Sequence, residues 1–229
     1  IVNKPAVTML EGQLTSAMME ELNNYVDNVR TESSDYSSNL VGQIKQNDKS
    51  QQLTMDMNAP VVKGLINILA ESGRKFLSTY SEDLQLKIEG DENFSKAPID
   101  CHSIWTVHIY AGDYNPLHDH DVSYAQKSMS FSIILYCKVP PQIANINQDI
   151  GLHSNGGSTD GCTQFVWGTN TAADFLTLRP REDTWIVPKE GKFIIFPCWL
   201  KHQVSPFYGE GERRTLSANF RVPFTTTSR

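Results

Sequence analysis

The sequence predicts a mainly β domain with flanking helices, an α+β fold in which an antiparallel barrel or sandwich carries its helices on one sheet. Two amphipathic patterns occupy the first 82 residues, and eight short runs rich in β-branched and aromatic residues follow. Clusters of Gly, Pro, Asn and Asp separate these runs, as turns separate strands. We therefore expect one domain over residues 1–229, with a helical flank over 1–82 and a β-barrel core over 83–229.

The two expected helices share a stripe of apolar residues at intervals of three or four. The first is predicted from Glu11 to Arg30 and carries Leu14, Met18, Leu22, Val26 and Val29 on one face. The second is predicted from Ala59 to Tyr80, with Pro60 in its first turn. Residues 31–52 between them are polar and rich in Ser, Asn and Gln, which indicates a surface loop.

The expected strands are short and alternate with turn residues. They are LQLKIE (84–89), SIWTVHIY (103–110), SFSIILYCKV (130–139), TQFVW (163–167), DFLTLRP (174–180), TWIVP (184–188), KFIIFP (192–197) and RTLSANFRV (214–222). The segment from 145 to 161 is too polar and glycine-rich for a core and is expected to be a loop.

Composition excludes some classes of function. The chain has 20 Lys and Arg against 26 Asp and Glu, a formal charge of −6, which argues against nucleic-acid binding by phosphate neutralisation. No apolar run approaches the roughly 18 residues that span a bilayer, so no membrane partner is expected. The four cysteines form no CxxC pair and the first residues do not follow the order of a signal peptide, which favours a cytoplasmic protein with free thiols.

The segment GDYNPLHDHD, residues 112–121, concentrates titratable side chains ahead of a strongly apolar run. Side chains two apart in an extended chain share a face, so His118 and His120 project together. Two such imidazoles can bind one metal ion at about 2.1 Å and need a third ligand from elsewhere. From this pattern alone, a solvated polar turn after Pro116 is an equal alternative.

Two later segments extend the pattern. His202 follows the apolar run KFIIFP and lies in an otherwise apolar neighbourhood. In RRTLSANF, the polar residues Arg213, Thr215, Ser217 and Asn219 alternate with Arg214, Leu216 and Ala218. If the polar face looks into a barrel, Arg213 is a buried cation that needs an anion, and a dicarboxylate would provide one.

This ordered set resembles the iron(II)- and 2-oxoglutarate-dependent oxygenases, whose fold is the double-stranded β-helix, a jelly-roll, cupin-like barrel. WTVHIYAGDYNPLHDH, FPCWLKHQVSPF and RRTLSANF are similar to a branch of small bacterial and phage oxygenases with a GDYNPxHxH-like signature. The resemblance covers roughly residues 103–222.

The resemblance implies a role for each motif residue. It implies His118, His120 and His202 as catalytic iron ligands, with Arg213 pairing the distal carboxylate of 2-oxoglutarate and Thr215 supporting that carboxylate. The wider superfamily has a carboxylate where this chain has His120, so Asp121 is the alternative second ligand. Asp119 and Asp121 are otherwise expected to orient the imidazoles.

The implied activity is that of a dioxygenase with iron(II), 2-oxoglutarate and O2 as cofactor and cosubstrates. It would couple oxidative decarboxylation of 2-oxoglutarate to hydroxylation of a substrate, either a peptidyl residue such as proline or a small metabolite. Two alternatives stay open at this stage: a cupin-like metal protein without oxoacid chemistry, and a zinc hydrolase with Asp119 or Asp121 as general base. Arg213 is the residue that discriminates an oxygenase from the cupin-like protein. The oligomeric state is not indicated by the sequence.

Overall fold

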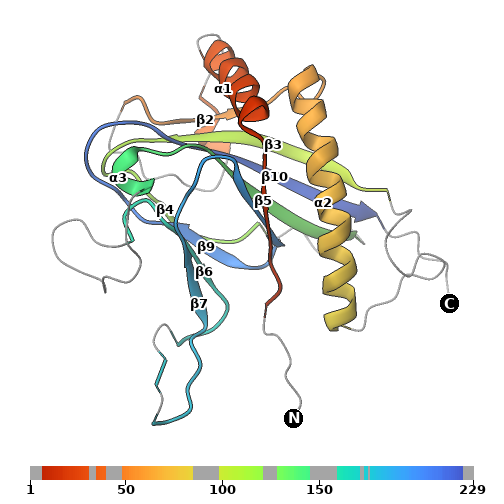
Figure 1. Cartoon of the computed structure of the whole chain (residues 1–229), viewed down its shortest axis with the longest axis vertical. Coiled ribbons are helices and arrows are strands. Elements are labelled where there is room, and N and C mark those ends of the chain that lie inside the picture. Colours follow the sequence, from red (N-terminus) through yellow and green to blue (C-terminus); the bar gives the residue numbers. More distant parts are fainter. Residues whose placement is uncertain are drawn as a thin grey trace.

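Two antiparallel sheets face each other in the computed structural model, and helices lie against the outer side of the larger one (Figure 1). The structure describes residues 7–30, 35–39, 48–84, 98–120, 128–144, 159–170, 173–174 and 176–223. Within them, the larger sheet has six strands in the order β1-β8-β5-β10-β3-β2, and the smaller has four in the order β4-β9-β6-β7. This architecture confirms the predicted mainly β, jelly-roll fold with helices on one sheet.

The elements of the larger sheet and its helices are bounded as follows: β1 (Leu10–Gln13), α1 (Ser16–Arg30), β2 (Gln51–Thr54), α2 (Pro60–Leu84), β3 (Asp100–Ile109), β5 (Ser128–Lys138), β8 (Lys192–Pro197) and β10 (Arg213–Pro223). The smaller sheet contains β4 (Asn115–His118), β6 (Thr163–Val166), β7 (Asp183–Ile186) and β9 (Lys201–Val204). Two short helices, η1 (Ser37–Asn39) and α3 (Pro141–Ala144), complete the set. None of these helices is both long and apolar enough to cross a membrane.

The first predicted helix begins too early. Residues 10–13 form β1, which pairs with β8 so closely that a side chain at Gly12 would overlap the ring of Phe193. α1 begins at Ser16, where the Thr15 hydroxyl accepts a hydrogen bond from the backbone N–H of Met18 at 3.3 Å. The apolar residue Leu14 fits the apolar stripe of a helix and the end of a strand equally well. Periodicity alone therefore could not show where the strand ends and the helix begins.

The second helix, α2, matches its prediction at the start and continues four residues past Tyr80. Of the predicted strand 84–89, only Leu84 is described, as the last residue of α2, and the remainder lies outside the described residues. The last two residues of the predicted loop 31–52, Gln51 and Gln52, are instead the first two residues of β2, which pairs with β3.

The predicted strand 174–180 is wrong. Asp174 and Arg179 form an isolated bridge around a turn, in which the Asp174 carboxylate accepts the backbone N–H groups of Leu176 and Thr177. Leu178 has a φ of 54°, outside the range of a strand. The local side-chain hydrogen bonds therefore outweigh the β propensity of the leucines.

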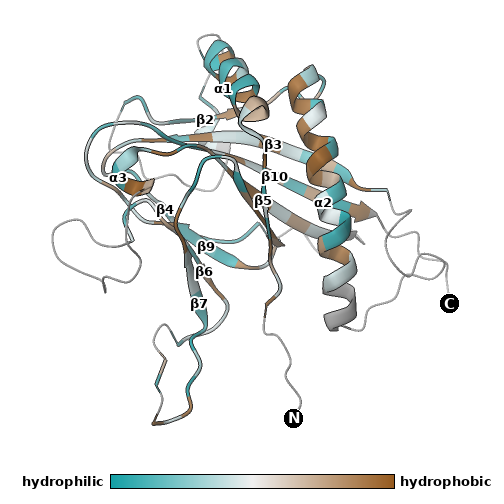
Figure 2. Ribbon diagram, viewed as in Figure 1, coloured by the Kyte–Doolittle hydropathy of each residue, from teal (hydrophilic) through white to brown (hydrophobic). Residues whose placement is uncertain are grey.

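The main core lies between the larger sheet and the two long helices. Phe131 of β5 is fully buried there, stacks on Phe220 with ring centroids 5.2 Å apart, and meets Phe76 of α2 at 5.9 Å. Figure 2 shows apolar residues recurring along α2, and several of them, among them Val62, Leu65 and Leu69, belong to this buried cluster. This cluster gives the fold a core that does not depend on polar residues between the sheets.

β10 has two chemically different faces, as its alternation predicted. Leu216, Ala218 and Phe220 belong to the helix-side core. Arg213 and Asn219 instead contact residues at the other face, toward the smaller sheet and the end of β4. Polar side chains along one strand are thus held between the two sheets.

Candidate metal centre

Three histidines converge where β4 and β9 meet. His118 at the end of β4 is the register partner of His202 in β9, and their ring centroids are 4.3 Å apart. His120 follows β4, and its backbone N–H donates to the Cys198 carbonyl at 2.9 Å. One potential ligand atom from each ring lies within 4.8 Å of the others, the arrangement needed for a shared metal ion.

The turn before β4 explains the rest of the GDYNP segment. Gly112 has a φ of 85°, a conformation that favours glycine, and its N–H donates to the Phe207 carbonyl at 2.9 Å. Asp113 is fully buried and accepts the backbone N–H of Tyr110 at 2.7 Å and the hydroxyl of Ser50. These bonds fix the turn that delivers the β4 histidines, so Asp113 has a structural role here.

Each of the three rings has a partner for its Nδ1 atom. For His118 it is the Pro116 carbonyl at 2.7 Å, and for His202 it is the Leu200 carbonyl at 3.1 Å. His120 Nδ1 lies 2.9 Å from Oδ1 of Asn219. Because carbonyl oxygens only accept, each ring carries its proton on Nδ1, and each Nε2 lone pair is left for a metal ion.

The environment keeps the imidazoles neutral. Burial lowers the pKa of His118 and of His202, the latter well below its usual value. Burial and the adjacent His118 lower the pKa of His120 to about 4. Since only neutral imidazole binds metals, the three side chains are ready to act as ligands at neutral pH.

Asp119 and Asp121 are the two acids expected to orient the imidazoles. Asp119 forms an ion pair with Lys201 at 3.1 Å, and the Nδ1 partners of the three rings are other groups. Asp121, the alternative second ligand, lies outside the described residues. The three residues that the structure brings together are therefore His118, His120 and His202.

Arg213 lies buried between the sheets, with 1% of its surface exposed. Its Nε donates to the Gly161 carbonyl at 2.8 Å and its Nη2 to the Thr163 hydroxyl at 3.2 Å. The guanidinium also lies 5.4 Å from the ring of Tyr136, whose hydroxyl donates to Thr163. No carboxylate of the described residues pairs with Arg213, and burial lowers the pKa of its guanidinium. Within the described part of the chain, Arg213 is therefore a buried cation without an anionic partner.

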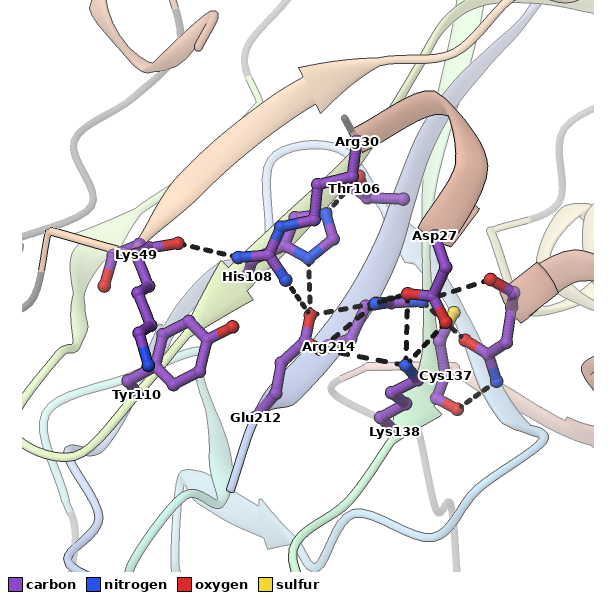
Figure 3. Close-up of polar contacts among 12 residues, drawn as sticks. Asp27, Arg30, Lys49, Thr106, His108, Tyr110, Cys137, Lys138, Glu212 and Arg214 are labelled. Carbon is purple, nitrogen blue, oxygen red and sulfur yellow. Dashed lines mark hydrogen bonds and ion pairs between the residues drawn. The ribbon is translucent and has the colours of Figure 1, made fainter. Parts of the chain in front are cut away.

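Arg214 points to the opposite face of β10. Figure 3 shows it reaching Asp27 of α1 and Glu212, in a cluster that also contains His108 and Arg30. Its charge is thus satisfied within the protein. The two adjacent arginines thus differ in a property that matters for binding an anion: among the described residues, Arg214 has carboxylate partners and Arg213 has none.

Thr215 shares the inward face with Arg213 by strand alternation, is 5% exposed, and is the register partner of Tyr136 in β5. Sequence reasoning did not find Tyr136 or Thr163 as neighbours of Arg213. Neither residue stands out in its apolar strand, and both meet Arg213 only through the pairing of distant segments.

Comparisons with known proteins agree with this geometry. The model of the family described as 2OG-Fe(II) oxygenase matches residues 103–219. No curated protein matches the chain.

Similar solved structures include a prolyl-4-hydroxylase from Pseudomonas putida, with 13% identity, a TM-score of 0.58, and coverage of 96% of this chain and 93% of that one. A viral collagen prolyl hydroxylase from Paramecium bursaria Chlorella virus-1, solved with 2-oxoglutarate, has 17% identity, a TM-score of 0.51, and coverage of 95% and 97%. HygX from Streptomyces hygroscopicus, solved with nickel and 2-oxoglutarate, has 10% identity, a TM-score of 0.55, and coverage of 96% and 83%. At these identities the likeness concerns the fold.

Proposed function

This chain belongs to the 2OG-Fe(II) oxygenase family, and from that premise we propose which of its residues bind iron(II) and 2-oxoglutarate and which class of substrate it oxidises. As a member it is a 2-oxoglutarate-dependent dioxygenase that uses iron(II) and O2. We assign His118, His120 and His202 as the iron ligands. The supporting observation is that all three Nδ1 atoms are occupied by hydrogen-bond acceptors, which leaves three neutral Nε2 atoms for one ion.

We assign Arg213 as the partner of the distal carboxylate of 2-oxoglutarate. Arg213 is buried, and no described carboxylate pairs with it. Such a guanidinium gains most from an anionic ligand, because its desolvation has already occurred in the folded protein. Thr163 and Tyr136 offer hydroxyl groups beside it, and Thr215 lies on the same face of the strand. The same observation disfavours a cupin-like protein or a zinc hydrolase, neither of which requires a buried cation for an oxoacid.

When bound, iron(II) supplies the redox chemistry by which O2 oxidises both 2-oxoglutarate and a C–H bond of the substrate. His118, His120 and His202 would hold the ion through their neutral Nε2 atoms. Arg213 orients 2-oxoglutarate through its far end. Phe165 and Phe196, both fully buried beside His202, keep the surroundings of the centre apolar and exclude water.

For the oxidised substrate, we propose a peptidyl residue, with proline as the first to test. Trp199, with 46% of its surface exposed, lies three residues before His202 in the chain. An exposed aromatic side chain close in the chain to a proposed metal ligand suits an extended peptide with a flat, apolar proline ring. Two of the similar folds are prolyl hydroxylases by name, which supports the same choice.

The ligand assignment is tested by anaerobic iron(II) titration. His118→Ala, His120→Ala and His202→Ala are each expected to lose stoichiometric iron binding and to keep the fold, because the helix-side core is separate. His102→Ala, an exposed histidine of β3, serves as the matched control and should bind iron normally. Unchanged iron content in His120→Ala would transfer the second ligand to Asp121.

The activity is tested by the formation of succinate from 2-oxoglutarate, measured by mass spectrometry. A slow rate without substrate should require iron(II), and Zn(II) should inhibit it by occupying the same imidazoles. Proline-containing peptides should raise the rate and gain the mass of one oxygen atom. Succinate formation that is indifferent to chelators would contradict the iron assignment, and a small metabolite that stimulates turnover where peptides do not would contradict the substrate class.

A further inference from the structure

We propose that Asn219 is a positioning residue that fixes the tautomer and direction of His120, an inference that rests on the proposed role of His120 as an iron ligand. Asn219 lies on the inward face of β10, and its Oδ1 is 2.9 Å from His120 Nδ1. Ser132 of β5 lies on the same side, with its hydroxyl 3.0 Å from that nitrogen. Two side chains of the larger sheet thus hold a ring that follows the end of β4.

In the structure the Oδ1 end of the Asn219 amide faces the ring. Nδ2 of Asn219 donates to the Ser103 hydroxyl at 3.1 Å, and the Ser132 hydroxyl donates to Oδ1 at 2.8 Å. With the amide in this orientation, both of its ends have hydrogen-bond partners and Oδ1 is an acceptor beside His120 Nδ1. An acceptor at that point requires the ring proton on Nδ1 and leaves Nε2 for the metal ion.

The three rings differ in what supplies the acceptor. His118 and His202 each use the backbone carbonyl two residues earlier, which no side-chain substitution removes. His120 lies beyond the last paired residue of β4 and depends on side chains 12 and 99 residues away. It is therefore the one ligand of the three whose orientation a point substitution can release.

The backbone of β10 is adapted to this task. The register between β10 and β3 shifts between Asn219 and Phe220, so that Asn219 is the partner of Ser103 while Phe220 is the partner of Cys101. Such irregularities re-aim side chains, often next to functional sites. The rings of Trp105 and Phe196 lie 5.7 and 6.3 Å from the His120 ring and restrict its movement, but neither offers an acceptor for Nδ1.

The test compares an isosteric loss of the acceptor with its retention. Asn219→Leu removes the acceptor, and Asn219→Asp keeps an oxygen beside Nδ1 that can also accept from Ser103. Loss of a group that orients a metal ligand weakens metal affinity by about 10- to 100-fold. For Asn219→Leu we expect a loss of iron(II) affinity near 10-fold, because the Ser132 hydroxyl can still accept from His120 Nδ1. For the Asn219→Leu, Ser132→Ala double variant we expect a loss near 100-fold. The affinity of Asn219→Asp should stay within a few-fold of wild type.

Three readouts separate positioning from general damage: the dissociation constant for iron(II) under anaerobic conditions, the ligand-field spectrum of the Co(II)-substituted protein, and the melting temperature of the metal-free protein. Ser217→Ala, a buried polar residue on the same face of β10, is the matched control and should leave the metal affinity and the spectrum unchanged. Asn219→Leu should shift the Co(II) spectrum, because His120 no longer presents Nε2 in a fixed direction.

The outcomes distinguish this inference from the proposed function. If wild-type protein binds no iron at the histidines, the proposed function fails. If wild type binds iron and the Asn219→Leu, Ser132→Ala double variant binds it as tightly as Ser217→Ala does, the positioning role is overturned. Loss of metal in Asn219→Asp would overturn it as well, and that variant keeps the test decisive even if Asn219→Leu does not fold.

Discussion

Exchange of Arg213 and of Arg214 for methionine should have opposite effects, although the two residues are adjacent. Arg213 is buried and has no carboxylate partner in the described ranges, and we propose that it binds 2-oxoglutarate. Removing one partner of a buried charge pair costs about 2–5 kcal/mol of binding free energy. Arg213→Met should therefore weaken 2-oxoglutarate binding by about 30- to 4,000-fold.

For the stability of the fold the order should be reversed: Arg214→Met should be the more damaging of the two variants. In the absence of 2-oxoglutarate, Arg213→Met gives up hydrogen bonds to Gly161 and Thr163. It also removes a buried cation that no carboxylate in the described part of the chain neutralises, and the desolvation of such a cation costs several kcal/mol. We expect the unfolding free energy of the metal-free protein to stay constant or to rise. Arg214→Met breaks ion pairs with Asp27 and Glu212 and should lower it by about 2–4 kcal/mol, discounted because Asp27 is 48% exposed.

The assay follows the visible charge-transfer band of the iron-loaded protein during anaerobic titration with 2-oxoglutarate, alongside urea unfolding of the metal-free protein. Arg214→Met should bind 2-oxoglutarate with nearly the affinity of wild type at a temperature where it is folded. If Arg214→Met loses 2-oxoglutarate binding and Arg213→Met keeps it, the assignment of faces along β10 is wrong by one residue, and the reasoning from the buried cation fails with it.

Two further predictions concern the fold. Burial opposes ionisation of Glu212, but hydrogen bonds from His108 and Arg214 lower the pKa of its carboxyl group from 4.5 to about 2. The ionised carboxylate should therefore contribute about 3 kcal/mol of stability above pH 4.5, and this contribution is lost as the pH falls toward 2. Glu212→Gln should remove this pH dependence, measured by urea unfolding at a series of pH values. Gly73→Ala should lower the unfolding free energy by about 1–3 kcal/mol despite the better helix propensity of alanine, because its methyl group would overlap the ring of Phe131. Gly64→Ala in the same helix meets nothing closer than 3.9 Å and should raise the unfolding free energy by up to about 1 kcal/mol, so equal effects of the two alanines would contradict the packing argument.

The faces of β10 could be predicted from the sequence because strand alternation is local: Arg213 and Asn219 are an even number of residues apart and share a face. That His202 lies beside His118 was expected only from the resemblance to a family. In the structure the two histidines are register partners, although they are 84 residues apart in the sequence. No local pattern could have supplied it.

The remaining site contacts were inaccessible for the same reason. The partnership of His120 with Asn219 crosses 99 residues, and the contact of Arg213 with Gly161 crosses 52. Strands as short as β4 and β9, with four residues each, carry too few alternating positions to stand out from loops. The turn at Asp174 was missed because its capping hydrogen bonds compete with a β-prone composition.

The strand found in place of a helix start, β1, has a consequence for where this chain can be shortened. β8 is one of the most apolar strands of the larger sheet, and β1 is the neighbour that occupies its outer edge over four residues. A shortened chain that began at Thr15 would keep both long helices and every candidate ligand. It would also bare the backbone donors and acceptors of Ile194 and its neighbours, a template on which a second molecule can add a strand. The residues of β1 thus cover the edge of β8 against edge-to-edge aggregation, a role that is unrelated to catalysis.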